Sequence, residues 1–198
     1  MNSKNSSVAL RDKLTGAEAI DDIPKCIEIC RTALAGRARL SSDDNWYFGI
    51  KLAALLKTRE SASSQDVDEA VAVMEHLLAV VSRQDKPMRW AFLNLQLGGA
   101  IVVRKGDLNE ALLHFENALE VFTREKNPED WALAKKAAGE IYYRLADSDA
   151  IAQLTKSLEY HRDALTVFTA EKDPGEGLIE TIDMIEGVIS RAKASSKS

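Results

Sequence analysis

The chain has 198 residues, of which 45% are hydrophobic and 29% charged, so it is long enough to bury one substantial core. Its formal net charge of −5 excludes a general affinity for nucleic acid phosphates, and no segment approaches the roughly 18 apolar residues that a membrane span needs. The 2 cysteines, Cys26 and Cys30, are too few for a disulfide framework.

The N-terminus, residues 1–7, is polar and lacks the apolar region of a secretory signal, so we expect a cytoplasmic protein. Residues 1–21 are expected to be partly disordered or to form a short helix at about 8–20. Apolar residues then recur at steps of three and four, which predicts helices along the rest of the chain. These helices are predicted at 22–38, 44–59, 66–84, 87–105, 107–125, 128–146, 152–171 and 175–193. Residues 194–198 are expected to be a disordered tail.

Three aspartates stand where predicted helices begin. Asp22, Asp66 and Asp107 can cap helix N-termini by accepting hydrogen bonds from free backbone N–H groups. Glu69 and Glu110 follow two of them by three residues, which indicates a capping-box-like pattern.

The sequence contains an internal repeat. Trp46, Trp90 and Trp131 are 44 and 41 residues apart. Pro87 and Pro128 each lie three residues before a tryptophan, Trp90 or Trp131. Pro174 marks the same junction 46 residues after Pro128. A second, unrelated feature with the same irregular spacing would indicate duplication rather than chance.

Small and apolar residues of the alternate helices follow the same spacing. One slot, with gaps of 44, 41 and 46 residues, holds Cys26, Ala70, Ala111 and Ser157. Seven residues further on, the corresponding slot holds Ala33, Leu77, Ala118 and Ala164. The repeating unit is therefore predicted to be a helix, a tight turn and a second helix.

At these residues the chain resembles the tetratricopeptide repeat family. Leu97-Gly98 and Ala138-Gly139 match the family's Leu-Gly slot, and Tyr142 matches its tyrosine. The second helix matches at Ala111, Phe115 and Ala118, and the closing prolines match as well. The period exceeds the family's usual length of about 34 residues, as in a long-repeat bacterial subclass. The resemblance implies an all-α fold in which antiparallel helix hairpins stack as a right-handed α-solenoid. It implies a single domain over residues 22–193 with about four helix pairs.

The sequence shows no motif for catalysis, a cofactor or a metal. His76, His114 and His161 have different offsets within their repeats, so we interpret each as a surface or boundary residue of a helix. Cys26 shares its slot with alanines, which indicates a packed small residue rather than a metal ligand. We therefore expect a protein that is not an enzyme and that carries no cofactor.

In the family, the first helix of each pair lines a concave face that binds a partner. Carried over to this sequence, that resemblance implies a groove lined by Phe48, Lys51, Leu55, Arg59, Phe92, Leu95, Val102, Lys136, Glu140, Tyr143 and Arg144. Its apolar centre and basic flanks suit a protein or peptide with apolar anchors and acidic groups. The expected function is a scaffold or adaptor for such a partner, with no role for nucleic acid or membrane.

Three alternatives stay open. In the first alternative, several of the predicted groove residues belong to the hydrophobic core, and the concave face has no distinct binding groove. In the second, the chain is a self-associating structural protein or regulatory subunit that forms homo-oligomers. In the third, the chain is an enzyme accessory subunit or a cryptic enzyme, which a metal or nucleotide found in purified protein would favour.

Overall fold

The computed structural model describes residues 3–36, 39–60, 62–146, 151–168 and 177–195. Over these ranges the chain forms nine helices and no strands, so the all-α expectation is confirmed. No helix in the described ranges has both the length and the apolar composition needed to cross a bilayer.

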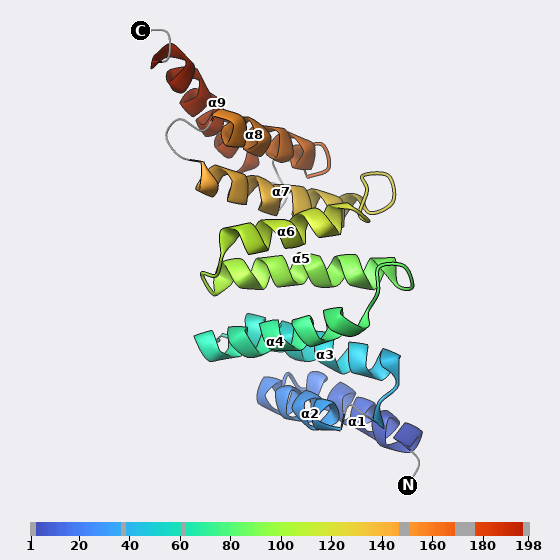
Figure 1. The fold of residues 1–198 in the computed structure, drawn as a ribbon. Helices are drawn as coiled ribbons and strands as arrows, with labels where there is room; N and C mark the ends of the chain where they lie inside the picture. The colour runs from blue at the N-terminus through green and yellow to red at the C-terminus, as the bar shows by residue number, and fades with distance from the viewer. Residues whose placement is uncertain (1–2, 37–38, 61, 147–150, 169–176, 196–198) are drawn as a thin grey trace. The chain divides into compact units, whose positions relative to one another are not determined.

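The chain divides into two compact units, Met1–Ser82 and Arg83–Ser198, and each is described by itself. The first unit contains α1 (Ser3–Glu18), α2 (Ile23–Ala35), α3 (Ser42–Thr58) and α4 (Ser64–Val80) (Figure 1). The second contains α5 (Pro87–Val103), α6 (Leu108–Leu119), α7 (Pro128–Leu145), α8 (Ile151–Leu165) and α9 (Leu178–Ser195). The predicted single domain of residues 22–193 spans both units and stays a prediction.

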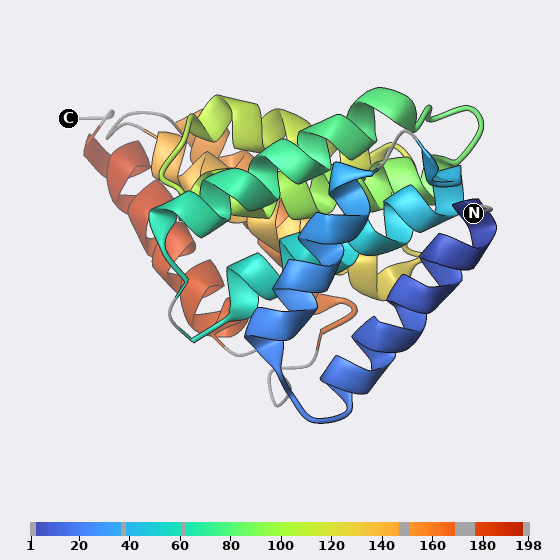
Figure 2. The same cartoon turned by 90° about the horizontal axis from the view of Figure 1, so that it is seen from below.

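Within the first unit each helix packs mainly against its neighbour in the chain, from α1 through α4. Figure 2 shows α1 and α2 joined by a short turn at one end. The helix expected at about 8–20 begins earlier, at Ser3, and buries Leu14 and Ala17. Burial of these apolar side chains explains why the N-terminal segment is ordered as a helix.

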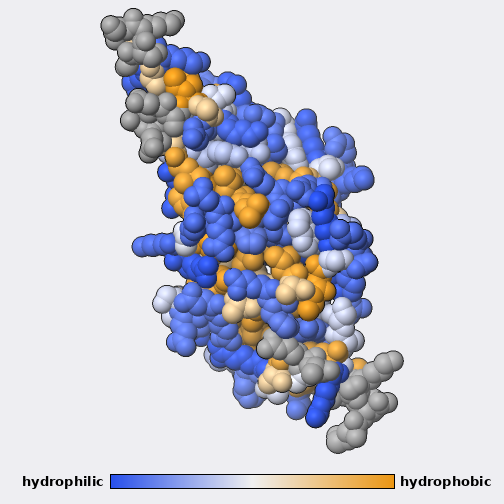
Figure 3. Space-filling model, in the orientation of Figure 1, coloured by the Kyte–Doolittle hydropathy of each residue, from blue (hydrophilic) through white to orange (hydrophobic). Residues whose placement is uncertain are grey.

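The second unit follows the same order, since α5 packs on α6, α6 on α7, α7 on α8 and α8 on α9. Its last three helices share two apolar clusters. Ala132, Ala164 and Leu178 form the first of them. Leu154, Ile185 and Ile189 form the second, against which Tyr143 packs. Hydrophobic residues also reach the surface, where Figure 3 shows separate patches among hydrophilic residues.

Two of the three predicted helix caps are confirmed. The Asp22 carboxylate accepts a hydrogen bond from the Lys25 amide at 3.0 Å, and Asp107 accepts one from the Asn109 amide at 2.8 Å. Each carboxylate satisfies a backbone donor that has no partner inside its own helix.

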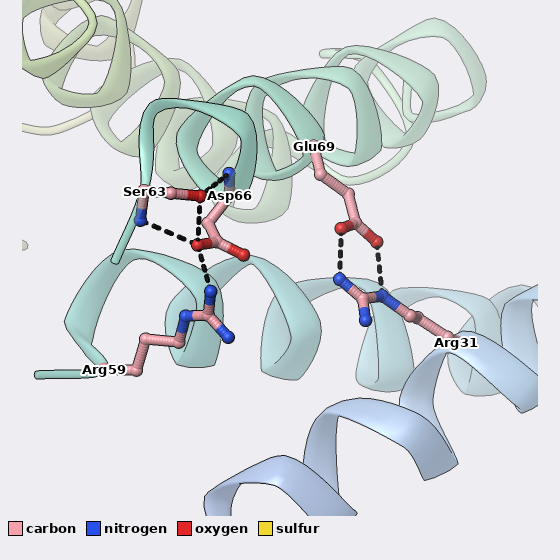
Figure 4. A network of polar contacts seen from close by, with 5 residues as sticks. All are labelled: Arg31, Arg59, Ser63, Asp66 and Glu69. Carbon is pink, nitrogen blue, oxygen red and sulfur yellow. Dashed lines mark hydrogen bonds and ion pairs between the residues drawn. The ribbon is translucent and has the colours of Figure 1, made fainter. Parts of the chain in front are cut away.

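The prediction that Asp66 caps its helix is wrong, because the helix begins one turn earlier. Ser63 is the N-cap of α4, and its hydroxyl accepts from the Asp66 amide at 3.2 Å. The Asp66 carboxylate reaches back to the Ser63 amide at 2.7 Å, which completes a capping box (Figure 4). The capping box satisfies two free backbone amides at once, which favours Ser63 over Asp66 as the N-cap of α4.

The other predicted helices are present with shifted ends. The predicted ends at 38 and 171, the predicted start at 175 and Pro174 lie outside the described residues, as do residues 196–198 of the predicted tail. The first two residues of that tail, 194 and 195, belong to α9.

Candidate partner-binding site

Four predicted groove residues lie on α3 or at its end. Phe48 is 0% exposed, so for this residue the groove expectation gives way to the core alternative. Leu55 is half-buried. Arg59 forms an ion pair with Asp66, so its guanidinium joins the capping box that starts α4 (Figure 4).

In the first unit, α1 reaches across to the predicted lining of α3. Lys51 pairs with Glu18 of α1 at 2.7 Å. The Arg11 guanidinium lies 5.9 Å from the centre of the Phe48 ring. Side chains of α1 thus contact the lining where the sequence predicted a partner, a contact between distant segments that the repeat pattern could not indicate.

Three further predicted residues lie on α5. Leu95 is 4% exposed and belongs to the core, which again follows the core alternative. Phe92 and Val102 are half-buried. Neither α3 nor α5 therefore presents the expected row of accessible side chains.

The four predicted residues on α7 are accessible to different extents. Glu140 and Arg144 are exposed, whereas Lys136 and Tyr143 are half-buried. The Tyr143 hydroxyl lies 3.8 Å from the Met184 sulfur of α9 and can donate a weak hydrogen bond to it.

Lys136 and Glu140 are brought together at a cavity of about 390 Å³ inside the second unit. Its walls come from three helices, with a residue immediately before α9. The lining consists of Leu133, Lys136, Ala137, Glu140, His161, Gly177, Leu178 and Thr181. The cavity combines an apolar surface with a cation, a carboxylate and an imidazole, a mixture typical of ligand sites.

The interpretation of His161 as a surface or boundary residue is wrong, because its side chain is 2% exposed. Its Nδ1 lies 2.8 Å from the Ser157 carbonyl oxygen and therefore donates to it. Ser157 is buried as well, and its hydroxyl donates to the Gly139 carbonyl oxygen of α7 at 2.8 Å. These two bonds satisfy polar groups between α7 and α8 that would otherwise be costly to bury.

Burial lowers the pKa of His161 below its ordinary value of 6.5. The hydrogen bond to Ser157 and the Glu140 carboxylate oppose that shift, whereas the Lys136 ammonium adds to it. The imidazole is thus held neutral near pH 7 and offers one nitrogen lone pair.

A signal in the sequence could have located this histidine. His161 stands 46 residues after Phe115, the same interval that separates Ser157 from Ala111. Alignment of the repeats therefore places His161 at the same core position as Phe115. A comparison of the three histidines with one another does not reveal this position.

Two further cavities lie in the first unit, one of about 500 Å³ between α1 and α2 and one of about 190 Å³ among α2, α3 and α4. The smaller one is lined by Asn45, whose Oδ1 is buried without a hydrogen-bond partner among the described residues. None of the predicted groove residues lines either cavity. Of these three cavities, the one beside α7 is lined by two predicted groove residues, Lys136 and Glu140.

Within the described ranges, no group of three or more His, Cys, Asp or Glu side chains is arranged to hold a metal ion. In comparisons with known proteins, no family model matches the chain, and no curated protein is significantly similar to it.

Proposed function

We propose that this chain is a non-catalytic binding module built from tetratricopeptide-like helix hairpins, which holds a protein or peptide partner. The observation that carries the proposal is the cavity beside α7. The family resemblance predicts Lys136 and Glu140 on a partner-binding face, and both line this cavity with His161.

Equivalent burial in the first helices supports the repeat. The positions three, seven and ten residues after each tryptophan are buried in all three helices. They are Gly49, Ala53 and Leu56 on α3, Leu93, Leu97 and Ala100 on α5, and Ala134, Ala138 and Ile141 on α7. Each tryptophan is itself half-buried. A shared inner face is what duplicated hairpins would retain.

The second helices agree with this register. The slot of Cys26, Ala70, Ala111 and Ser157 is buried in every copy, as is the slot of Ala33, Leu77, Ala118 and Ala164. Small residues at such positions let helix axes approach to about 8–10 Å. Gly98 illustrates the approach, because a Cβ added there would lie 2.9 Å from the Phe115 ring of α6.

The charges on α7 indicate the chemistry of the partner. Lys136 and Arg144 supply positive charge on a helix whose accessible surface also includes the apolar Leu133. A partner segment with apolar anchors and acidic groups would complement this surface.

The test is a charge reversal, Lys136→Glu with Arg144→Glu, in the full chain. We expect partner capture from the native cell extract to fall at least tenfold while the thermal unfolding midpoint stays within a few degrees, because Arg144 is exposed and Lys136 is only half-buried. Capture is measured by quantitative pull-down.

The matched control is Arg124→Glu with Lys126→Glu, which changes the net charge equally at exposed positions of the same unit. This control should capture as wild type does. If the α7 variant captures equally well, the α7 surface is not the binding site.

A further inference from the structure

Alignment of the repeats shows that the hairpin formed by α7 and α8 differs from the others at two core positions. The slot four residues after the small-residue slot holds Cys30, Met74, Phe115 and His161, and all four are buried. In α6 the pair is Ala111 and Phe115, whereas in α8 it is Ser157 and His161. Two polar residues thus replace an apolar pair, and one of them, His161, lines the cavity.

The hydrogen bonds of His161 determine which ring nitrogen carries the lone pair. Nδ1 donates to the Ser157 carbonyl, so in the neutral ring Nε2 is the acceptor. A Cβ on Gly139 would lie 2.7 Å from Nδ1 and 2.8 Å from Cε1, so that edge of the ring faces α7. Nε2 makes no hydrogen bond with the described residues. Because His161 lines the cavity, its Nε2 is an acceptor at this site that has no donor among the described residues.

The rest of the lining narrows the choice of occupant. A carboxylate could pair with Lys136, but it would bring a second acceptor to Nε2 and face Glu140. An ammonium or guanidinium could pair with Glu140, but it would face Lys136. A neutral donor avoids both conflicts. Leu133, Ala137 and Leu178 supply apolar contact for the body of such a group.

A phenol fits these requirements better than an indole. Its hydroxyl can donate to Nε2 and also accept from the Lys136 ammonium on the same wall, whereas an indole N–H only donates. A cavity of about 390 Å³ is near the lower end of ligand sites, which suits one side chain rather than a helix. Tyrosine is also enriched at the centres of protein interfaces.

We propose that this cavity is an anchor pocket for one tyrosine side chain of the partner, whose hydroxyl donates to His161 Nε2. That this tyrosine belongs to a partner protein rests on the proposed function. The pocket itself can be tested without any partner, so a failure of the tyrosine pocket can be distinguished from a failure of the proposed function.

The test uses p-cresol, the tyrosine side-chain analogue, with toluene as the analogue that lacks the hydroxyl. Each is titrated into the 198-residue chain and followed by amide chemical shifts in NMR. We expect saturable shifts from p-cresol at residues 133–140, 161 and 177–181, and roughly threefold to tenfold weaker binding of toluene.

The matched variant is Ser157→Ala with His161→Phe, which copies the Ala111 and Phe115 pair of α6 and is therefore expected to fold. Its preference for p-cresol over toluene should be smaller than that of the wild-type protein, because only the Lys136 contact to the hydroxyl remains. Ser157→Ala alone retains the backbone carbonyl that orients His161, and it should keep the preference for p-cresol.

Three results would overturn the proposal. One is equal affinity of the wild-type protein for p-cresol and toluene, and another is the absence of saturable shifts at the cavity. The third is tighter binding of 3-methylindole than of p-cresol, which would assign the pocket to tryptophan instead.

Discussion

Single residues determine the polar character of the interface between α7 and α8. His161 is buried, and its ring is held by the Ser157 carbonyl against Gly139. Because an imidazolium is more costly to bury than a neutral imidazole, the fold favours the neutral form. Protonation therefore couples the stability of this interface to pH.

We expect acid to destabilise the wild-type protein more than the Ser157→Ala, His161→Phe variant. The folded-state pKa of His161 lies below 6.5, so this contribution is fully present above pH 6.5. It declines as the pH falls below 6.5, by at most about 1.4 kcal/mol per pH unit, until the folded protein is protonated too. Lys136 and Glu140 face the same group and are unchanged in the variant.

The measurement is urea unfolding of both proteins at pH 7.5 and pH 5. An identical loss of unfolding free energy in the two proteins would show that His161 is not held neutral by burial.

At the scale of the helix, the start of α4 is specified by local hydrogen bonds. The Ser63 hydroxyl and the Asp66 carboxylate bond to each other's backbone amides, and Arg59 from the end of α3 joins them. Figure 4 shows this cluster beside the two parallel bonds from Arg31 to Glu69, at 2.8 and 2.5 Å. The second pair joins α2 to α4, but its side chains are 50% and 32% exposed, so its contribution to stability is small.

Ser63→Ala should destabilise the protein by about 0.5–2 kcal/mol, because it removes the acceptor that caps α4. Ser64→Ala is the control, since Ser64 is exposed at the first position of the same helix. Chemical unfolding of the two variants measures the difference. Equal stability would show that Asp66 or water replaces the cap.

Two adjacent glycines of α5 should respond oppositely to the same change. A Cβ at Gly98 would meet the Phe115 ring at 2.9 Å and the Ala111 carbonyl oxygen at 3.1 Å, whereas Gly99 has nothing within 4 Å. Gly98→Ala should therefore destabilise by about 1–3 kcal/mol through overpacking. Gly99→Ala should stabilise by up to about 1 kcal/mol, because alanine favours the helix.

Thermal unfolding by circular dichroism tests this pair. If Gly98→Ala stabilised the protein, α5 would not approach Ala111 and Phe115 of α6 closely enough for an added methyl group to clash.

For the whole molecule, the distribution of exposed apolar residues bears on self-association. The large exposed hydrophobic side chains among the described residues are Val8, Ile20, Val80, Met88, Val103, Leu113, Leu133, Ile179 and Met184. No described helix carries more than two of them. Scattered single residues are ordinary on a monomer, and the net charge of −5 makes copies repel.

We therefore expect multi-angle light scattering to give the mass of one chain at all concentrations up to about 10 mg/ml. A stable dimer would instead favour the alternative of a self-associating structural or regulatory subunit. The Leu133→Ser variant would then show whether the α7 surface forms the contact, because loss of that side chain would weaken the dimer.

The sequence by itself determined where the helices lie, because the spacing of apolar residues and the capping side chains act within a few residues of each other. It also determined which slots of the second helices are buried, as at Ala70, Ala111 and Ala118. Only the tertiary structure decided that Phe48 and Leu95 belong to the core and that α1 contacts the lining of α3. It likewise placed His161 beside Lys136, Glu140 and the start of α9. Burial depends on which distant helix packs against a residue, and a pattern that repeats along one helix does not specify its neighbour.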